Sequence, residues 1–527
     1  MSVVAGLAAR AGRTGCGRGT GRGHVSWSKA PPVVLIVEIF QESRRQVVHV
    51  QKGALLLHVL FESGVTASQA LCAGAGLCGR CRVRFLDAAP SPMPEEQARL
   101  SDDELASGWR LACKHVLLVS CRIEVFAAVP RPVHAVSGSS LAVDLGTTRI
   151  KWAVSGDRLE HSLVNPQMGA GSEIMSRLRY ALGSERGAAV LRESVLSVLT
   201  ALVRETGALS LAVAGNSVMT ALLVGAPLHT LAFAPYSLPL RGGRVFSLDN
   251  RLPDTYIPPL LAPFVGGDVS AGLATLRHAP RPFLLADLGT NGEFVLALDD
   301  SRFLVTSVPM GPAIEGVGLC CGSMAGPRVL TRIGVGPDGL FWQAEEPVEG
   351  ISGSGYASLL ASLLRVGLLA ADGHFQNGVM PLARKIFSGV RQFREGRVLM
   401  ITEQVYLAER DIEEFLKVKA GVNCAVNTLL GRAGLRTEDL NGVYLAGALG
   451  EYIDAADLCR LGFFPETARE VIRLAGNTSL AGALLALENE GVRNWLAELP
   501  ERVAVESLVE HDGFADDFVR AMRFEWV

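Results

Sequence analysis

The 527-residue chain lacks several features that would define a protein class at once. Its 50 lysines and arginines nearly balance 53 aspartates and glutamates, so the net charge of -3 gives no electrostatic signal for nucleic-acid binding. No stretch reaches 18 uninterrupted apolar residues, because the best candidate, 356–370, is broken by Arg365. A membrane-spanning helix is therefore not expected. Ten cysteines are too few for a disulfide scaffold.

Acidic residues are missing from the first 33 positions, and the first acid is Glu38. This stretch is rich in glycine and arginine, which is typical of an organelle transit peptide but also of an unstructured tail or a start placed too early. We expect a disordered tail over 1–33. The remaining composition, 49% hydrophobic and 20% charged, is that of an ordinary globular protein of about three to four domains.

Four of the cysteines follow a cluster-ligand pattern. Cys72, Cys78 and Cys81 have the spacing C-x5-C-x2-C, and Cys113 follows after 31 intervening residues. Plant-type [2Fe–2S] sites use C-x4-C-x2-C and a distant fourth cysteine, so the first gap is one residue longer here. Strands expected at 34–40, 45–50 and 82–86 and a helix at 54–63 favour a β-grasp ferredoxin.

A zinc site, or four unrelated cysteines, is the alternative. Zinc sites prefer paired C-x2-C knuckles, whereas the second half here has only Cys113. Three glycines in the loop also fit a cluster, because they let backbone N–H groups approach its sulfur atoms. The pattern therefore favours [2Fe–2S], and the other six cysteines are interpreted as structural or as part of the tail.

The rest of the chain contains an internal repeat. Leu141–Thr148 and Leu285–Gly292 each predict a strand, a tight polar turn and a following strand. Repeats this far apart indicate two similar lobes and not a solenoid, whose periods are much shorter. We expect an N-terminal unit at 34–129, a linker at 130–139, and lobes at 140–280 and 281–527.

Both turns have the chemistry of a phosphate loop. Gly146 permits the turn, backbone N–H groups and the hydroxyls of Thr147 and Thr148 bind phosphate oxygens, and Asp144 holds Mg²⁺ through water. An apolar strand running into a glycine-rich turn at 444–450 would seat an adenosine. Two ordinary β-turns and a helix cap would give similar motifs, but not all three in this order. The predicted nucleotide contacts are Gly146, Thr147, Thr148, Gly289, Thr290, Asn291, Gly447, Ala448 and Gly450.

Asp144, Asp268 and Asp287 are the predicted catalytic carboxylates. Asp268 follows Gly266 and Gly267, so it would either orient a water that attacks the γ-phosphate or cap a helix. Glu315 is a further candidate with an equally plausible structural role. Lys419 falls on an apolar helical face, where it would reach the nucleotide, snorkel, or pair with a local acid.

Taken in order, the loops resemble those of the acetate and sugar kinase, Hsp70 and actin superfamily. With the cysteine set in front, the chain from about Val34 to its end resembles the reductive activators of corrinoid proteins. Further motifs carry that resemblance: Cys78-Gly79-Arg80-Cys81, Trp109-Arg110-Leu111-Ala112-Cys113, Asn165-Pro166-Gln167, Gly215-Asn216-Ser217, Val265-Gly266-Gly267-Asp268, Asp287–Glu293, Gly353-Ser354-Gly355, Leu445-Ala446-Gly447 and Gly476-Asn477.

The resemblance implies an α/β multidomain fold, with a β-grasp plant-type ferredoxin domain followed by a two-lobed actin-like, ribonuclease H-like ATPase. It implies a [2Fe–2S] cluster, ATP and Mg²⁺ as cofactors, and an activity that returns a corrinoid protein from Co(II) to Co(I) in support of methyl transfer. The expected partners are that corrinoid protein and an upstream electron donor, with no nucleic acid or membrane. The expected location is the cytoplasm, and a homodimer stays open.

Some positions depart from the family pattern. Family members often carry a linker domain between the ferredoxin and ATPase parts, whereas here only the short linker at 130–139 separates them. Ala448-Leu449 replaces a more usual Gly-Phe, and Thr220 stands where histidine is common. Two other functions stay open. One is a small-molecule kinase with a regulatory ferredoxin domain, and the other is an ATP-gated redox sensor or electron carrier.

Overall fold

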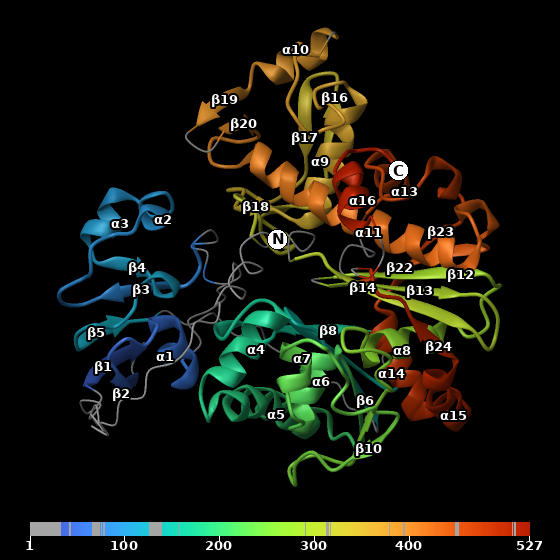
Figure 1. Ribbon diagram of the computed structural model, residues 1–527. Helices are drawn as coiled ribbons and strands as arrows, with labels where there is room; N and C mark the ends of the chain where they lie inside the picture. The colour runs from blue at the N-terminus through green and yellow to red at the C-terminus, as the bar shows by residue number, and fades with distance from the viewer. Residues whose placement is uncertain are drawn as a thin grey trace, which may run out of the picture.

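The computed structural model has three main sheets, and each belongs to a different part of the chain (Figure 1). It describes residues 33–527 except for short gaps. Predictions that fall on the tail before residue 33, the linker at 130–139, Cys72, Cys78, Thr290, Glu315, Ala448 and Gly450 lie outside the described residues. The gaps are 42–43, 66–73, 75, 77–78, 126–139, 157–158, 290, 312–315, 317, 379, 394–395, 448–452, 509 and 511–512.

The N-terminal unit, residues 33–125, is a five-stranded sheet in the order β2-β1-β5-β3-β4 with one helix packed on it. Along β1 the apolar residues Leu35, Val37 and Ile39 are buried while their neighbours are more exposed, as expected for a strand with one face on a core. The elements are β1 Val34–Gln41, β2 Arg44–Gln51, α1 Leu56–Glu62, β3 Arg82–Phe85, α2 Pro94–Gln97, α3 Asp102–Ala106, β4 Trp109–Leu111, η1 Ala112–Lys114 and β5 Cys121–Glu124.

The first lobe is built on a six-stranded sheet in the order β10-β11-β9-β6-β7-β8, which begins at Ser140. Its strands are β6 Ser140–Leu145, β7 Arg149–Val154, β8 His161–Val164, β9 Ser210–Ala214, β10 Arg244–Phe246 and β11 Thr255–Ile257. Its helices are η2 Pro166–Gly169, α4 Ile174–Gly183, α5 Gly187–Thr206, α6 Ser217–Val224, α7 His229–Ala232 and α8 Gly267–Thr275.

The second lobe has a six-stranded sheet in the order β23-β22-β12-β13-β14-β24 and three small sheets. The large sheet contains β12 Phe283–Leu288, β13 Asn291–Ala297, β14 Phe303–Pro309, β22 Gly442–Ala446, β23 Ile472–Gly476 and β24 Val503–Val505. The small sheets contain β15 Val329–Leu330, β16 Ile333–Gly336, β17 Gly339–Trp342, β18 Gly350–Ile351, β19 Val390–Phe393, β20 Gly396–Met400 and β21 Tyr406–Ala408. The helices are α9 Gly353–Arg365, α10 Pro381–Phe387, α11 Glu409–Ala433, η4 Thr437–Asp439, α13 Ala455–Arg460, η5 Glu466–Ala468, α14 Thr478–Glu488, α15 Glu490–Glu498, η6 Leu499–Arg502 and α16 Phe514–Ala521.

The two large ATPase sheets share one pairing pattern. In the first lobe β6 pairs with β7 antiparallel and with β9 parallel. In the second lobe β12 pairs with β13 antiparallel and with β22 parallel. The internal repeat that the sequence predicts is therefore confirmed as two equivalent strand-turn-strand units, each at the centre of its own sheet.

Helices α8 and α14 join the lobes by close packing. A Cβ atom added to Gly482 of α14 would lie 1.8 Å from the carbonyl oxygen of Ala271 in α8. Glycine is required there, because any side chain would push the helices apart. Helix α14 also packs on strands β6 and β9 of the first lobe although it follows β23 of the second, so it belongs structurally to both.

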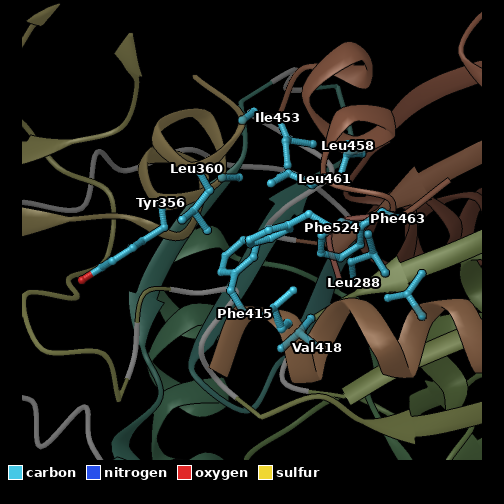
Figure 2. Packing of buried hydrophobic residues seen from close by; sticks show 14 of the residues in the cluster. Leu288, Tyr356, Leu360, Phe415, Val418, Ile453, Leu458, Leu461, Phe463 and Phe524 are labelled. Atoms are coloured by element: carbon cyan, nitrogen blue, oxygen red, sulfur yellow. The ribbon is translucent and has the colours of Figure 1, made fainter. Parts of the chain in front are cut away.

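The core of the second lobe surrounds the long helix α11, which confirms the predicted apolar face (Figure 2). Lys419 on that face is fully buried and donates to the carbonyl oxygens of Ala521, at 3.0 Å, and Glu525. Burial lowers the pKa of Lys419 to about 8. The lysine therefore anchors the C-terminal segment to α11, and among the described residues it pairs with no acidic side chain and does not line the nucleotide cleft.

Candidate functional site

A cleft between the two lobes collects the residues that the two loop motifs predict. The first lobe contributes Asp144, Gly146, Thr147 and Thr148, and the second contributes Asp287, Gly289, Asn291 and Gly447. The remaining lining residues are Arg149, Lys151, Asn216, Asp268, Glu293, Asn477 and Ser479. The cavity is about 150 Å³, smaller than the ~300–1,000 Å³ typical of ligand sites, so the lobes are close together in this conformation.

Asp144 links the lobes across this cleft. Its carboxylate accepts hydrogen bonds from Asn477 Nδ2 at 3.1 Å and Ser479 Oγ at 3.0 Å, both at the start of α14. Asn477 also caps that helix, because its Oδ1 accepts the backbone N–H of Leu480 at 2.9 Å. Burial raises the pKa of Asp144, although the positive charge of Lys151 and the two hydrogen bonds partly lower it.

The first phosphate loop is held by two asparagines. Asn165 Nδ2 donates to the carbonyl oxygen of Gly146 at 2.8 Å, and Asn216 Nδ2 donates to Thr147 Oγ1 at 3.2 Å. A Cβ atom on Gly146 would lie 2.6 Å from the carbonyl oxygen of Arg149, so the turn admits only glycine. Side chains from 19 and 69 residues away thus fix the loop conformation.

Arg177 in α4 is a fully buried guanidinium that the sequence reasoning missed. It donates to the carbonyl oxygen of Thr147, to Gln167 Oε1 at 3.1 Å and to the carbonyl oxygen of Gly171 at 3.0 Å. Buried charges require such partners. The available signal was an arginine on the apolar face of an amphipathic helix, beside Ile174 and Leu178.

Further carboxylates from both lobes gather in the cleft. Asp268 lies in the first turn of α8, whose N-cap is Gly266, so the helix-cap alternative for Asp268 is wrong. Burial, with the charges of Asp287 and Asp144, raises the pKa of Asp268 to about 8. Burial and the neighbouring Asp268 and Asp287 also raise the pKa of Glu293 well above its usual range. Each of these carboxylates therefore opposes the ionisation of its neighbours.

The carboxylates suit a hydrated cation better than a directly bound one. Among the residues that the structure describes, no three His, Cys, Asp or Glu side chains converge closely enough to hold a bare metal ion. Mg²⁺ typically keeps several waters and binds through one or two carboxylates and substrate phosphates. Gly447, at the end of β22, closes this side, since a Cβ atom there would lie 2.5 Å from Asp287 Oδ1.

The cysteine loop lies in the N-terminal unit, where Cys81 and Cys113 are buried and Cys72 and Cys78 fall outside the described residues. Gly74, Gly76 and Gly79 have φ values of 85°, 80° and 62°, which glycine adopts without strain. The loop can therefore turn its backbone N–H groups toward a bound cluster, in agreement with the predicted type of site.

The segment that carries Cys113 is tied back to the rest of the unit. Ala112 N donates to the carbonyl oxygen of Cys81 at 2.8 Å. Glu96, fully buried, accepts from Leu111 N at 2.6 Å and contacts His115 Nε2 at 2.8 Å. These bonds hold the segment of Cys113 beside Cys81.

The N-terminal unit contacts both lobes. On the first lobe, α1 packs against η2 and α4, where Tyr180 OH donates to Glu62 Oε1 at 2.7 Å and the Tyr180 ring lies 5.0 Å from that of His58. On the second lobe, Arg80 Nη2 donates to Ser323 Oγ at 2.6 Å. The unit thus spans the two lobes that close on the nucleotide cleft.

Comparison with known proteins gives matches along nearly the whole chain. Three family models match: a 2Fe-2S iron-sulfur cluster binding domain at 39–118, the RACo middle region at 139–278, and the C-terminal domain of RACo, described as the ASKHA domain, at 281–526. These matches confirm the predicted fold class of a ferredoxin domain followed by an actin-like ATPase. Among the described residues, no helix has the length and apolarity to span a membrane.

Two curated relatives match over most of their length. The corrinoid activation enzyme RamQ of Eubacterium limosum is 26% identical over 430 residues, which are 74% of this chain and 71% of the relative. The [Co(II) methylated amine-specific corrinoid protein] reductase of Methanosarcina barkeri is 26% identical over 420 residues, 70% and 73%. A solved reductive activator for corrinoid, iron-sulfur protein shares the fold, with a TM-score of 0.65, 22% identity, and coverage of 92% and 98%.

Proposed function

Because the chain belongs to the RACo family of reductive activators of corrinoid proteins, we propose that it uses ATP to return an inactive Co(II) corrinoid protein to Co(I). One observation carries this proposal: two phosphate loops that are more than 140 residues apart in the sequence line the same cleft. The same chain also contains the cysteine loop. Each part of the proposed reaction therefore has its own group of residues.

In the nucleotide cleft, the hydroxyls of Thr147 and Thr148 and the backbone N–H groups of both loops bind the phosphate oxygens. Thr290, Asn291, Gly447, Ala448 and Gly450 complete the predicted nucleotide contacts on the second lobe. Asp144 and Asp287 would hold Mg²⁺ through water, and the cation would neutralise charge at the phosphates.

Asp268 orients the water that attacks the γ-phosphate. Its side chain lines the cleft at the start of α8, together with Asp144 and Asp287. The backbone N–H of Gly267 donates to the carbonyl oxygen of Gly215 at 2.9 Å, which anchors the start of α8 to the turn beside Asn216. That anchor fixes Asp268 relative to the first phosphate loop.

In the N-terminal unit, Cys72, Cys78, Cys81 and Cys113 hold the [2Fe–2S] cluster, which supplies one electron when it is bound. Burial excludes water from Cys81 and Cys113, and the positive φ values of Gly74, Gly76 and Gly79 would let loop N–H groups turn toward the cluster sulfur atoms. Hydrogen bonds of that kind set the potential of such a site.

Contacts between the parts supply a route for coupling. Helix α1 packs on η2, and Asn165, which caps η2, donates to the carbonyl oxygen of Gly146 in the phosphate loop. Coupling between linked sites is typically about 1–3 kcal/mol. Moving one electron through about 100 mV costs roughly 2.3 kcal/mol, which falls within that range. The free energy of coupling between ATP binding and lobe movement is therefore sufficient to drive an electron transfer that is unfavourable by about 100 mV.

The partner is a corrinoid protein of a methyltransferase system, and an upstream donor reloads the cluster. ATP hydrolysis by the cluster-loaded protein tests the proposal: a Co(II) corrinoid protein should stimulate it at least about tenfold, while the methylated form of the same protein should not. Equal rates with both forms, or none with either, would contradict the proposal.

A further inference from the structure

One buried carboxylate closes the turn that carries Cys113. Glu96 in α2 is fully buried, and its Oε1 accepts the backbone N–H of Leu111 at 2.6 Å. The same oxygen lies 2.8 Å from Nε2 of His115. Leu111 precedes Cys113 by two residues, and His115 follows it by two. A single oxygen atom therefore joins the two ends of the segment that presents this cysteine.

The hydrogen-bond partners of Glu96 all lie within the N-terminal unit. Its other oxygen, Oε2, accepts the backbone N–H of Met93, the N-cap residue of α2, at 2.8 Å. Among the described residues, the side chain bonds only to these two N–H groups and to the His115 ring. Buried donors that lose such an acceptor have no water to replace it. An acceptor oxygen at this position is therefore needed to keep the turn closed.

Helix α2 also packs on the loop that carries the first three cysteines. Lys114 Nζ lies 2.7 Å from Glu95 Oε1 and donates to the carbonyl oxygen of Gly74 at 3.4 Å. A Cβ atom on Gly76 would lie 2.9 Å from Glu95 Cβ. The helix thus contacts both halves of the cysteine set, the loop on one side and the turn of the fourth cysteine on the other.

We propose that Glu96 is a positioning residue that sets the reduction potential of the [2Fe–2S] cluster by closing the turn of Cys113. The inference rests on the proposed function, which takes Cys113 as a cluster ligand and requires a low-potential electron donor. It deepens that function by naming a residue that controls the donor site. Hydrogen bonds to the sulfur atoms and solvent exposure tune the potential of iron–sulfur clusters, and both depend on how the ligand segment is held.

Two substitutions of similar size separate closure of the turn from the charge of the carboxylate. Glu96→Gln and Glu96→Met both remove the charge, but only the glutamine variant keeps an oxygen that accepts hydrogen bonds. An opened turn in Glu96→Met should weaken the N–H···S hydrogen bonds that stabilise the reduced, more negative cluster. Its equilibrium constant for reduction should therefore lie at least tenfold below that of Glu96→Gln, which corresponds to about 59 mV for one electron.

Glu104 provides the control pair, because it holds the same place in the capping box of α3. Its Oε2 accepts the backbone N–H of Ser101 at 2.8 Å, and its Oε1 pairs with Arg82 Nη1 at 2.7 Å. Among the described residues, its side chain makes no hydrogen bond to the Cys113 turn. Glu104→Met and Glu104→Gln should differ less than about threefold, since partly exposed ion pairs contribute little.

The potentials are measured by redox titration of the cluster-loaded chain, without corrinoid protein or ATP. The visible spectrum of the oxidised cluster and the EPR spectrum of the reduced one show that each variant holds a [2Fe–2S] cluster. Assembly of the cluster in Glu96→Gln but not in Glu96→Met, with both Glu104 variants loaded, would support the same role for turn closure.

Three results would overturn the proposal. Equal potentials of Glu96→Gln and Glu96→Met would show that closure of the turn does not matter. An equal separation within the Glu104 pair would indicate general destabilisation of the unit, and a cluster in neither Glu96 variant would assign the residue to folding alone. A separated Glu96 pair together with failed corrinoid reduction by the unmodified chain would refute the proposed function and leave this inference standing.

Discussion

The cysteine site and the nucleotide site are built in opposite ways. The four predicted cysteine ligands span 42 residues of the N-terminal unit, and the bonds that hold the segments of Cys81 and Cys113, from Glu96 and Ala112, lie within that unit. The nucleotide cleft instead depends on contacts across 333 and 335 residues, where Asn477 and Ser479 meet Asp144. A local site keeps its geometry while the lobes move, whereas a cleft built from two lobes changes with them. This difference suits an electron carrier driven by a nucleotide.

The largest expected effect is the loss of the cluster, with nucleotide binding kept, when one cysteine ligand is removed. Cys113→Ser removes one of the four thiolates, so the [2Fe–2S] visible spectrum should disappear. Because the cleft shares no residue with that loop, the dissociation constant for a fluorescent ATP analogue should change less than about twofold. Loss of nucleotide binding together with the spectrum would contradict two independently built sites.

The reverse change is Asp144→Asn, which removes the charge on the first phosphate loop but keeps its size. ATP-dependent corrinoid reduction should fall at least about 100-fold, the scale for removing one preorganised electrostatic group. The visible spectrum of the cluster should be unchanged. A reduction rate like that of the unmodified chain would remove Asp144 from the mechanism.

Arg177→Met tests whether long-range bracing matters to the first loop. The variant leaves the carbonyl oxygens of Thr147 and Gly171 without their buried donor, so the free energy of unfolding should fall by about 3 kcal/mol. ATP affinity should weaken about tenfold, which corresponds to about 1.4 kcal/mol. Arg179→Met, exposed on the same helix, is the control in urea unfolding and nucleotide titration. Equal effects of the two variants would contradict a bracing role.

The carboxylates of the cleft predict a pH dependence. The pKa of Asp268 is raised to about 8 in the folded chain, so folding favours its protonated form. Its stabilising contribution is complete below the unfolded pKa of about 4 and is lost as pH rises toward 8. In the absence of Mg²⁺ and nucleotide, Tm should therefore fall across this window, and Asp268→Asn should flatten the decline. A decline of the same slope in both proteins would contradict the assignment.

The smallest expected effect concerns the contact that connects the sites. Tyr180→Phe removes the hydrogen bond to Glu62 and leaves the ring packed on His58. A single such bond contributes about 1 kcal/mol, so amide hydrogen exchange in α1 should accelerate about fivefold. Unchanged exchange would show that ring packing alone holds α1 on the first lobe.

Local patterns in the sequence predicted much of this molecule. The strands β1, β2 and β3, the repeat and the α11 face follow from hydrophobic periodicity, and the two Asp-x-Gly turns follow from short-range chemistry. Arg177, Asn216, Asn477 and Ser479 were not predicted as site residues, because only tertiary contact brings them to the first loop and Asp144. The roles of Lys419 and Asp268 could not be predicted for the same reason. Lys419 binds the C-terminal segment, and Gly266, not Asp268, caps α8.

An anaerobic visible spectrum of a Co(II) corrinoid protein, mixed with this chain, a reductant and Mg·ATP, tests the central claim most directly. The account predicts a Co(I) band that grows only when ATP is present and is absent with Asp144→Asn or Cys113→Ser. A band that grows equally without ATP, or no band with an intact cluster and several corrinoid proteins, would contradict it.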